Sequence, residues 1–556
     1  MRSNRRKISR RAFLAAPAVV AVAEATRPQS ARAFAPSFSH AANNDKIAKA
    51  AILSVRNCAS DGFVSVPSWL PRPFEADLLR NDPALMRELS LRAADIVARG
   101  VFDPDDFSEP QLVTLPKNTH DARRICALVE PLDTAVYLTL AVLTAPLIEQ
   151  HKISPSSNVV HSYRFLPGRS RLFEKRFSII SFLTAAERQA PPDGLVIKCD
   201  LANCYGSITS ERMAAMLERC GVPAWQVEFI GGLLRFWQHP DSPGLPIGSN
   251  ASRILSEAVL LQVDRRLREA NVPYIRFVDD FRIFASDDSA ARLALEALTD
   301  AAASQGLSLN ADKTEFVRVA NATTDQAATA ERSQESPRRK RYRLFLAATA
   351  SGYAALPKFF AHASAEEIRL LRRVRNAMDA ASFLHGEIAP LPTLGRAFRW
   401  AVYAGSSEFL RAMPRVLTRY PEFAAYAASG LIWESKFVPA DVRDHLRTEF
   451  AAMLLDQATP DFVAVKLIDV LSHSAYRDRE TLVRFATERA RQPRGIAVRA
   501  ALDALRESGG IVPAVASRFE EMDGWCKRAV LADRTCRHSI TYSDGDLDLI
   551  GASLAS

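Results

Sequence analysis

The chain has 556 residues, of which 48% are apolar and 24% are charged, and its formal net charge is +9. A chain of this length can bury several cores, so roughly two to four globular domains are expected. Its seven cysteines form no CxxC pair, which argues against a structural zinc site and a disulfide framework. The positive charge suits a polyanionic partner, although many basic proteins bind none.

Residues 1–44 differ from the rest of the chain. Ser9–Leu14, a segment with two adjacent arginines, precedes the apolar run Ala15–Ala23, and Ala33–Ala35 offers a cleavage site. This pattern is similar to a twin-arginine export signal. A disordered basic tail and a start codon assigned too far upstream are the alternatives, and Glu24 at the end of the weak apolar run favours them. No later run of about 18 uncharged apolar residues predicts a membrane-spanning helix.

Residues 45–190 are predicted to be mainly helical, and residues 191–320 to alternate strands with helices. A polar stretch follows over residues 321–356. It contains the basic run Arg338–Arg343, which is typical of a linker or an exposed loop.

Residues 357–556 show the pattern of repeated amphipathic helices. Ser364 and Glu367 form a capping box, and apolar residues recur at helical spacing from Ile368 onward. The pattern permits an all-α, HEAT-like solenoid, although no strict repeat is visible. Arginines within 369–375 either bind nucleic acid or form the solvated face of the first helix.

Acidic residues follow two apolar strand patterns. Asp200 ends one apolar run, and Asp279 and Asp280 stand between apolar residues that alternate on both sides. The second pattern predicts a β-hairpin with the carboxylates at its tip. A carboxylate at the end of a buried strand needs a partner or a metal ion. An acidic surface hairpin is the alternative, and we interpret the pairs at 105–106 and 287–288 as solvated loop carboxylates.

Further features accompany these carboxylates. Tyr205 closely follows Asp200, and the small-residue loop Gly244–Ser252 leads into an amphipathic helix. Small residues let a backbone approach a ligand closely. Lys313, within Gly306–Phe316, is placed to neutralise or protonate an anionic leaving group. A core aromatic is the alternative for Tyr205, and a surface lysine is the alternative for Lys313.

The order and spacing of these features resemble those of reverse transcriptases. Four segments are similar to palm motifs A, B, C and D: Asp200 with Tyr205, Gly-Leu-Pro-x-Gly-Ser at 244–249, Phe-Val-Asp-Asp at 277–280 and Leu-Asn-x-x-Lys-Thr at 309–314. The resemblance covers roughly residues 115–320. It implies an α+β, right-hand polymerase fold, with fingers and an RRM-like antiparallel palm sheet followed by the all-α domain. Upstream, Asn158–Arg164 and Arg171–Phe173 resemble the fingers segment of bacterial reverse transcriptases.

The resemblance also implies roles for individual residues. Asp200, Asp279 and Asp280 would bind two Mg²⁺ ions, which Mn²⁺ could replace, and the backbone carbonyl of Leu201 would complete one site. Tyr205 would be the steric gate that favours deoxynucleotides, and Lys313 would act on the leaving pyrophosphate. The nucleotide-binding residues implied are Tyr205, Leu201, Gly248, Ser249, Arg123 and Arg124.

Two residues depart from the reverse transcriptase pattern. Phe277 stands where many relatives carry tyrosine, which removes a hydroxyl contact to the primer. Ile247 replaces the glutamine common in the Pro-Gln-Gly loop, which puts nucleotide selectivity in doubt. With the helical C-terminal half, these changes point to the abortive-infection and related defence-associated enzymes of bacteria.

The leading prediction is an RNA-directed DNA polymerase in antiphage defence, with RNA or DNA template–primer and dNTPs as partners. One alternative is an untemplated DNA polymerase primed from a tyrosine such as Tyr342, Tyr403 or Tyr542. Another is a non-catalytic nucleic-acid-binding scaffold with a decayed palm. Because polymerisation needs nucleotides, we expect a cytoplasmic protein without a membrane partner, and we interpret the export pattern as a false one. Homo-oligomerisation stays open.

Overall fold

The computed structural model describes residues 40–63, 73–116, 123–240, 242–319, 391–489, 495–537 and 547–555, together with 360, 362–365, 368–369, 384–386 and 540. By its contacts the chain divides into residues 1–43, of which 40–43 are described, and a compact unit of residues 44–556. The predicted export motif, the basic linker and Glu367 of the predicted capping box lie outside the described residues. So do Arg372, Arg373 and Arg375.

The N-terminal part contains α1 (His40–Asp61), α2 (Phe74–Asn81), α3 (Pro83–Ala98) and α4 (Pro131–His151). Asp82 caps α3 by accepting hydrogen bonds from backbone N–H groups of its first turn. α4 packs against α3 and against α9 (Asn250–Glu269). Among the described residues, α4 alone is long and apolar enough to cross a membrane, but 78% of its apolar window is buried inside the protein. Its apolar surface is therefore used in the core.

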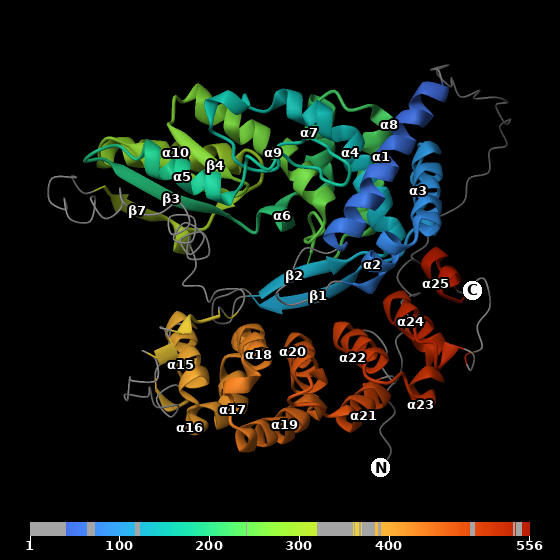
Figure 1. The fold of residues 1–556 in the computed structure, drawn as a ribbon. Coiled ribbons are helices and arrows are strands. Elements are labelled where there is room, and N and C mark those ends of the chain that lie inside the picture. The colour runs from blue at the N-terminus through green and yellow to red at the C-terminus, as the bar shows by residue number, and fades with distance from the viewer. Residues whose placement is uncertain are drawn as a thin grey trace, which may run out of the picture. The chain divides into compact units, whose positions relative to one another are not determined.

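Residues 195–318 contribute an antiparallel sheet of five strands, four of which have the order β4-β5-β3-β6. The strands are β3 (Leu195–Ala202), β4 (Tyr274–Phe277), β5 (Asp280–Ala285), β6 (Ser308–Leu309) and β7 (Glu315–Arg318), and β7 also pairs with β3. Together α9 and α10 (Asp288–Ala303) cover one face, and α5 (Ile179–Gln189) packs on the other (Figure 1). This mixture of helices and antiparallel sheet agrees with the predicted α+β fold.

Short helices complete this part. They are α6 (Cys204–Ser207), α7 (Ser210–Arg219), α8 (Ala224–Phe236) and the 3₁₀ turns η1 (Pro104–Asp106), η2 (Pro155–Ser157) and η3 (Ala311–Lys313).

The acidic strands differ in detail from the prediction. β3 continues two residues past Asp200, because Leu201 and Ala202 pair with β6. Asp279 lies in the turn as expected, but Asp280 already pairs with Phe277 and begins β5. The pattern within one strand does not reveal a partner that lies far along the chain.

The C-terminal helices stack in two rows (Figure 1). One row consists of α15 (Leu391–Ala404), α18 (Ala424–Trp433), α20 (Asp461–Ser472), α22 (Ile496–Glu507) and α24 (Gly524–Leu531). The other consists of α16 (Ser407–Arg411), α17 (Met413–Arg419), α19 (Ala440–Leu455), α21 (Arg479–Arg489) and α23 (Pro513–Ala516). Three 3₁₀ turns connect helices of the two rows: η4 (Pro421–Phe423), η5 (Ser435–Phe437) and η6 (Phe519–Glu521). The last helix, α25 (Leu549–Ala555), packs on α24. We call residues 391–555 the helical domain; its HEAT-like character stays a prediction.

A hairpin of β1 (Gln111–Pro116) and β2 (Arg123–Leu128) lies between the sheet and the helical domain (Figure 1). Val113 and Cys126, which face each other in the register, belong to the core of the helical domain. Ala127 belongs to the core around the sheet. Adjacent residues of a strand point to opposite faces, so this one hairpin contributes to both cores. It falls within the segment predicted to be mainly helical.

Glu75 connects the N-terminal helices to the helical domain. Its buried carboxylate forms salt bridges with Arg499 and Arg528, both at 3.0 Å. Arg528 also pairs with Glu130, which precedes α4, at 2.7 Å. Burial alone raises the pKa of Glu75, but the two guanidinium groups outweigh burial and hold its pKa below the ordinary value.

Replacing Glu75 by glutamine removes one charge from this buried cluster and leaves two arginines short of a partner. We expect the free energy of unfolding to fall by about 3 kcal/mol, because a buried charge without its partner is costly. Urea unfolding followed by circular dichroism measures the change. The control is Asp441→Asn, which breaks the exposed salt bridge between Arg411 and Asp441 and should leave the curve unchanged. Equal effects of both substitutions would contradict the structural role of the buried cluster.

Candidate active site

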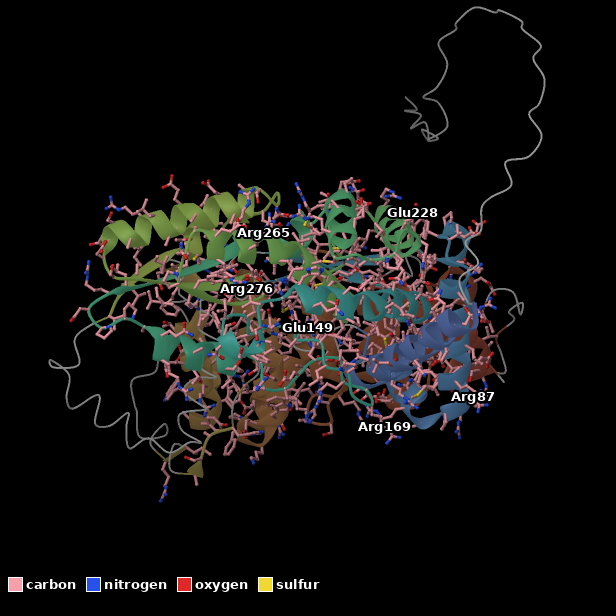
Figure 2. All side chains as sticks on the ribbon, turned by 90° about the horizontal axis from the view of Figure 1, so that it is seen from above. Arg87, Glu149, Arg169, Glu228, Arg265 and Arg276 are labelled. Carbon is pink, nitrogen blue, oxygen red and sulfur yellow. The ribbon has the colours of Figure 1, made fainter. Side chains whose placement is uncertain are left out.

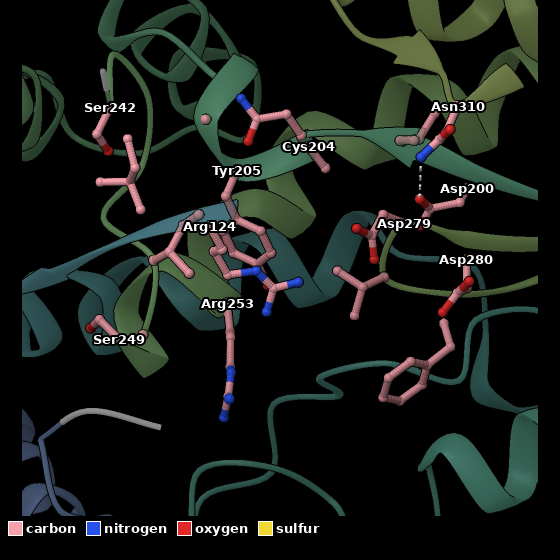
Figure 3. Close-up of a pocket in the computed structure, with 18 of the residues that line it drawn as sticks. Arg124, Asp200, Cys204, Tyr205, Ser242, Ser249, Arg253, Asp279, Asp280 and Asn310 are labelled. Atoms are coloured by element: carbon pink, nitrogen blue, oxygen red, sulfur yellow. Dashed lines mark hydrogen bonds between the residues drawn. The ribbon is translucent and has the colours of Figure 1, made fainter. Parts of the chain in front are cut away.

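The pairing of β3 with β5 brings the predicted acidic residues together. Asp200 lies directly opposite Asp280 in the register, so both side chains project from the same face of the sheet. The backbone N–H of Leu201 donates a hydrogen bond of 3.0 Å to the carbonyl of Asp279, which holds the turn beside β3. Figure 3 shows the three aspartates close together at one side of a pocket.

Negative charge is crowded at these carboxylates. Burial, followed by the charges of Asp280 and Asp200, raises the pKa of Asp279 to about 7. Burial also raises the pKa of Asp280 to about 6; Arg282 opposes this rise and Asp200 adds to it. Such a site attracts cations, because a nearby positive charge relieves the repulsion.

Lys313 supplies one such positive charge. Its Nζ lies 2.7 Å from Oδ2 of Asp200, and the two side chains are only 15% and 13% exposed. Asn310 holds the preceding turn against β3, since its backbone N–H donates to the carbonyl of Asp200 at 2.8 Å. Its side-chain amide lies 3.5 Å from the same carboxylate (Figure 3). The structure therefore places Lys313 at the carboxylates and not on an open surface.

The turn between β4 and β5 is strained. Val278 and Asp279 form this two-residue turn, and the φ of Val278 is 58°, in the left-handed region. A β-branched residue rarely adopts this conformation, which costs about 1 to 3 kcal/mol. Val278 is buried, with 4% of its surface exposed. Packing around the turn therefore retains a conformation that the chain alone disfavours.

A buried ion network holds β4 directly before this turn. The guanidinium of Arg276 pairs with Asp264 at 2.7 Å and with Glu257 at 2.9 Å, both on α9. Lys152, which follows α4, pairs with Glu257 at 3.0 Å. Burial raises the pKa of Glu257, but Arg276 and Lys152 outweigh burial and bring it down to about 2. Figure 2 labels Arg276 among the densely packed side chains of this region.

The segment predicted to resemble the fingers joins β4 at the same place. Val160 forms a parallel bridge with Arg276, and the backbone N–H of His161 donates to the carbonyl of Arg276 at 2.9 Å. The hydroxyl of Ser162 donates to Glu257 at 2.7 Å. The segment is thus fixed to the hairpin that carries Asp279 and Asp280.

Tyr205 lines the same site from the start of α6. Its side chain is hydrogen-bonded to that of Tyr163, and burial raises its pKa well above the ordinary value. The Tyr163 ring lies 5.0 Å from the ring of Phe173 and 5.5 Å from the guanidinium carbon of Arg253. Tyr163 therefore links Tyr205 to the predicted fingers segment and to α9.

The small-residue loop approaches α6 through its backbone. The N–H of Leu245 donates to the carbonyl of Tyr205 at 2.9 Å. A Cβ atom on Gly244 would lie 2.2 Å from the same oxygen, so a side chain does not fit there. Gly248 has a φ of 120°, which favours glycine, and the Ser249 hydroxyl caps α9 by accepting from the N–H of Ala251.

These elements border a cavity of about 440 Å³. All the residues predicted to bind metal or nucleotide line it: Arg123, Arg124, Asp200, Leu201, Tyr205, Gly248, Ser249, Asp279, Asp280 and Lys313. The two arginines come from β2, and Figure 3 shows Arg124 beside Tyr205. The structure brings these residues together, and their individual roles stay predictions.

Residues 131–349 match the family model of reverse transcriptase (RNA-dependent DNA polymerase). The match indicates a reverse transcriptase domain within these residues. The matched range holds the three aspartates, whereas Arg123 and Arg124 precede it. No curated protein matches the sequence. The domain supports a nucleotidyltransferase that uses a nucleic acid template and dNTPs.

Further residues that were not predicted to bind metal or nucleotide line the cavity, among them Tyr163, Arg253 and Asn310. Arg253 lies one turn into α9, the helix that Ser249 caps. Its position directly after the small-residue loop could have predicted that it lies at the cavity. Asn310 belongs to the segment Leu309–Thr314, which resembles palm motif D. Tyr163 belongs to the predicted fingers segment Asn158–Arg164, but that pattern did not predict its left-handed backbone, which has a φ of 42°.

Tyr403 is one of the three tyrosines predicted as possible primers of DNA synthesis, and its position in the structure does not allow that role. It lies in the helical domain with 1% of its surface exposed, and its hydroxyl donates to Glu434 at 2.9 Å. A buried hydroxyl with this partner is not accessible to a nucleotide. Tyr342 and Tyr542 lie outside the described residues.

The donor chemistry of the reverse transcriptase site fits a hard divalent cation. Carboxylate oxygens are the ligands that Mg²⁺ prefers. Burial, followed by the charge of neighbouring carboxylates, raises the pKa of Asp279, and burial with the charge of Asp200 raises that of Asp280. Within the described part of the chain, however, no three His, Cys, Asp or Glu side chains already stand close enough to hold a metal ion. Small side-chain adjustments of the aspartates would have to accompany binding.

Replacing Gly244 by alanine forces a methyl group against the Tyr205 carbonyl. We expect the loss of about 1 to 3 kcal/mol of stability and of nucleotidyl-transfer activity, because the loop has to move away from α6. Thermal unfolding and primer extension measure these effects. Gly168→Ala is the control, since its Cβ would meet only the Cβ of Arg171, at 4.0 Å. Wild-type behaviour of Gly244→Ala would show that the close approach is unimportant.

Proposed function

We propose that the protein is an RNA-directed DNA polymerase that extends a primer by nucleotidyl transfer with two divalent metal ions. One observation carries the proposal: Asp200 stands opposite Asp280, with Asp279 in the adjoining turn, inside a reverse transcriptase domain. Two-metal nucleotidyl transfer needs carboxylates that gather at the reacting phosphate.

The aspartates Asp200, Asp279 and Asp280 would hold the ions, with the carbonyl of Leu201 as a further oxygen donor. When bound, Mg²⁺ or Mn²⁺ supplies charge neutralisation and activates the primer 3′-hydroxyl. The protein's own contribution is positioning. Because two of the aspartates lie opposite each other in the strand register and the third lies in a buried turn, their backbone positions would need little reorganisation during the reaction.

Positive side chains would act on the triphosphate. Arg124 lines the cavity, and its charge lowers the pKa of Asp279, so it lies close enough to act on the same anionic centre. Lys313, at 2.7 Å from Asp200, is placed to give a proton to a leaving pyrophosphate oxygen beside that carboxylate. Both groups would stabilise the charge that develops on the leaving group.

Tyr205 would determine sugar specificity. Its ring lines the cavity close to Asp200 in the chain and is held through Tyr163. A ring that cannot move aside excludes a nucleotide with a 2′-hydroxyl by steric clash. This arrangement favours dNTPs and hence DNA synthesis.

The proposed setting is antiphage defence in the bacterial cytoplasm, with RNA as a template. Its support comes from the helical domain and from two apolar residues at the site. Phe277 packs against the rings of Tyr163 and Phe182, both at 6.2 Å. Ile247 packs against the core of the helical domain. Both residues that depart from the reverse transcriptase pattern are therefore used in packing within this chain.

The combined substitution Asp279→Asn and Asp280→Asn should abolish DNA synthesis, because it removes two of the three carboxylates without changing their shape. The measurement is extension of a DNA primer on RNA and on DNA templates with Mg²⁺. Glu296→Gln combined with Asp300→Asn is the matched control, since it removes two exposed carboxylates from α10 and should keep full activity.

Synthesis by the double aspartate variant would refute the assignment of these residues. Synthesis by the wild type without any template would favour the untemplated alternative. No synthesis and no nucleotide binding by the wild type would favour a scaffold with a decayed palm.

A further inference from the structure

The helical domain reaches the wall of the reverse transcriptase cavity. Phe462, the second residue of α20, is 4% exposed and belongs to the core of the helical domain. Its ring centroid lies 5.5 Å from the guanidinium carbon of Arg123, on β2. α20 also packs against β1 of the same hairpin. A ring fixed in one domain thus contacts a cation that lines the cavity of the other.

A second wall of the cavity rests on the helical domain as well. Ile247, in the small-residue loop, packs against the helical core, and its carbonyl accepts a hydrogen bond of 3.3 Å from the N–H of Ala127 on β2. The hairpin and the loop are therefore joined to each other and supported from the same side.

Arg123 is exposed and lines the cavity. At the cavity wall, the guanidinium group of Arg123 lies over the face of the Phe462 ring. An aromatic face orients a guanidinium group and leaves its N–H donors available for an anion. Guanidinium groups bind phosphate oxygens in a bidentate manner.

We propose that Phe462 is a positioning residue that orients Arg123 toward the triphosphate of the incoming nucleotide. The helical domain thereby sets the nucleotide affinity of the polymerase. This inference rests on the proposed function. Phe462 lies outside residues 131–349, which match the reverse transcriptase model, yet it would contribute to nucleotide binding.

The test is a double-mutant cycle with Phe462→Leu, Arg123→Ala and the combination of both in the full chain. The first readout is equilibrium binding of dTTP with Mg²⁺ to the enzyme on poly(rA) with a dideoxy-terminated oligo(dT) primer, measured by calorimetry. The second is steady-state extension of oligo(dT), which separates KM for dTTP from kcat.

We expect Phe462→Leu to raise Kd and KM by about two- to fivefold with kcat nearly unchanged, which is the range of an exposed cation–π contact. Arg123→Ala should weaken binding by about tenfold or more, since it removes charge-assisted bonds to phosphate. Adding Phe462→Leu to Arg123→Ala should change nothing further, because the ring acts only through the arginine.

Two controls separate positioning from general damage to the fold. Phe450→Leu removes the same ring from a fully buried place on α19 and should leave KM unchanged. Phe462→Tyr keeps an aromatic face and should keep wild-type affinity. Thermal unfolding of each variant shows whether it is folded.

An unchanged Kd in Phe462→Leu, or equal losses in the presence and absence of Arg123, would overturn the inference. The same holds if Phe450→Leu weakens binding as much as Phe462→Leu. These results leave the proposed function standing, whereas a wild type without aspartate-dependent synthesis would refute the function itself.

Discussion

The antiparallel register between β3 and β5 is the constraint on which the site depends. Ile197, Cys199 and Leu201 of β3 are buried in the main core, so the alternate residues, including Asp200, must face the other side. A shift of one residue would expose these apolar side chains and turn Asp200 away from Asp280. The hydrophobic core therefore determines where the carboxylates meet, and their mutual repulsion is the electrostatic cost of that arrangement.

The surroundings of the hairpin offset this cost. Arg276, buried beside Glu257 and Asp264, fixes β4 to α9 immediately before the strained turn at Val278. Lys313 brings a positive charge to Asp200 from the far edge of the sheet. On the other side of the cavity, the β1–β2 hairpin is shared between two cores, so the positions of its arginines depend on the helical domain. The site is thus assembled from segments that span most of the described chain.

Sequence patterns predicted those parts of the site that lie within or next to a segment with a clear strand or loop pattern. The alternation around Asp279 and the apolar run before Asp200 predicted a hairpin and a strand, and the structure has both. What the patterns could not supply was pairing between distant segments: β6 beside Leu201, the strained backbone of Tyr163, and the contact of Phe462 with Arg123. Each depends on tertiary packing, which local periodicity does not encode.

The central proposal is that Asp200, Asp279 and Asp280 share divalent cations once their side chains adjust. Mn²⁺ binding to the full chain, followed by electron paramagnetic resonance, tests it without requiring a template or a primer. We expect the wild type to bind Mn²⁺ and either Asp200→Asn or Asp280→Asn to weaken binding by about tenfold or more, since even outer-shell changes have effects of this size. Equal Mn²⁺ affinity in the wild type and both variants would contradict the account.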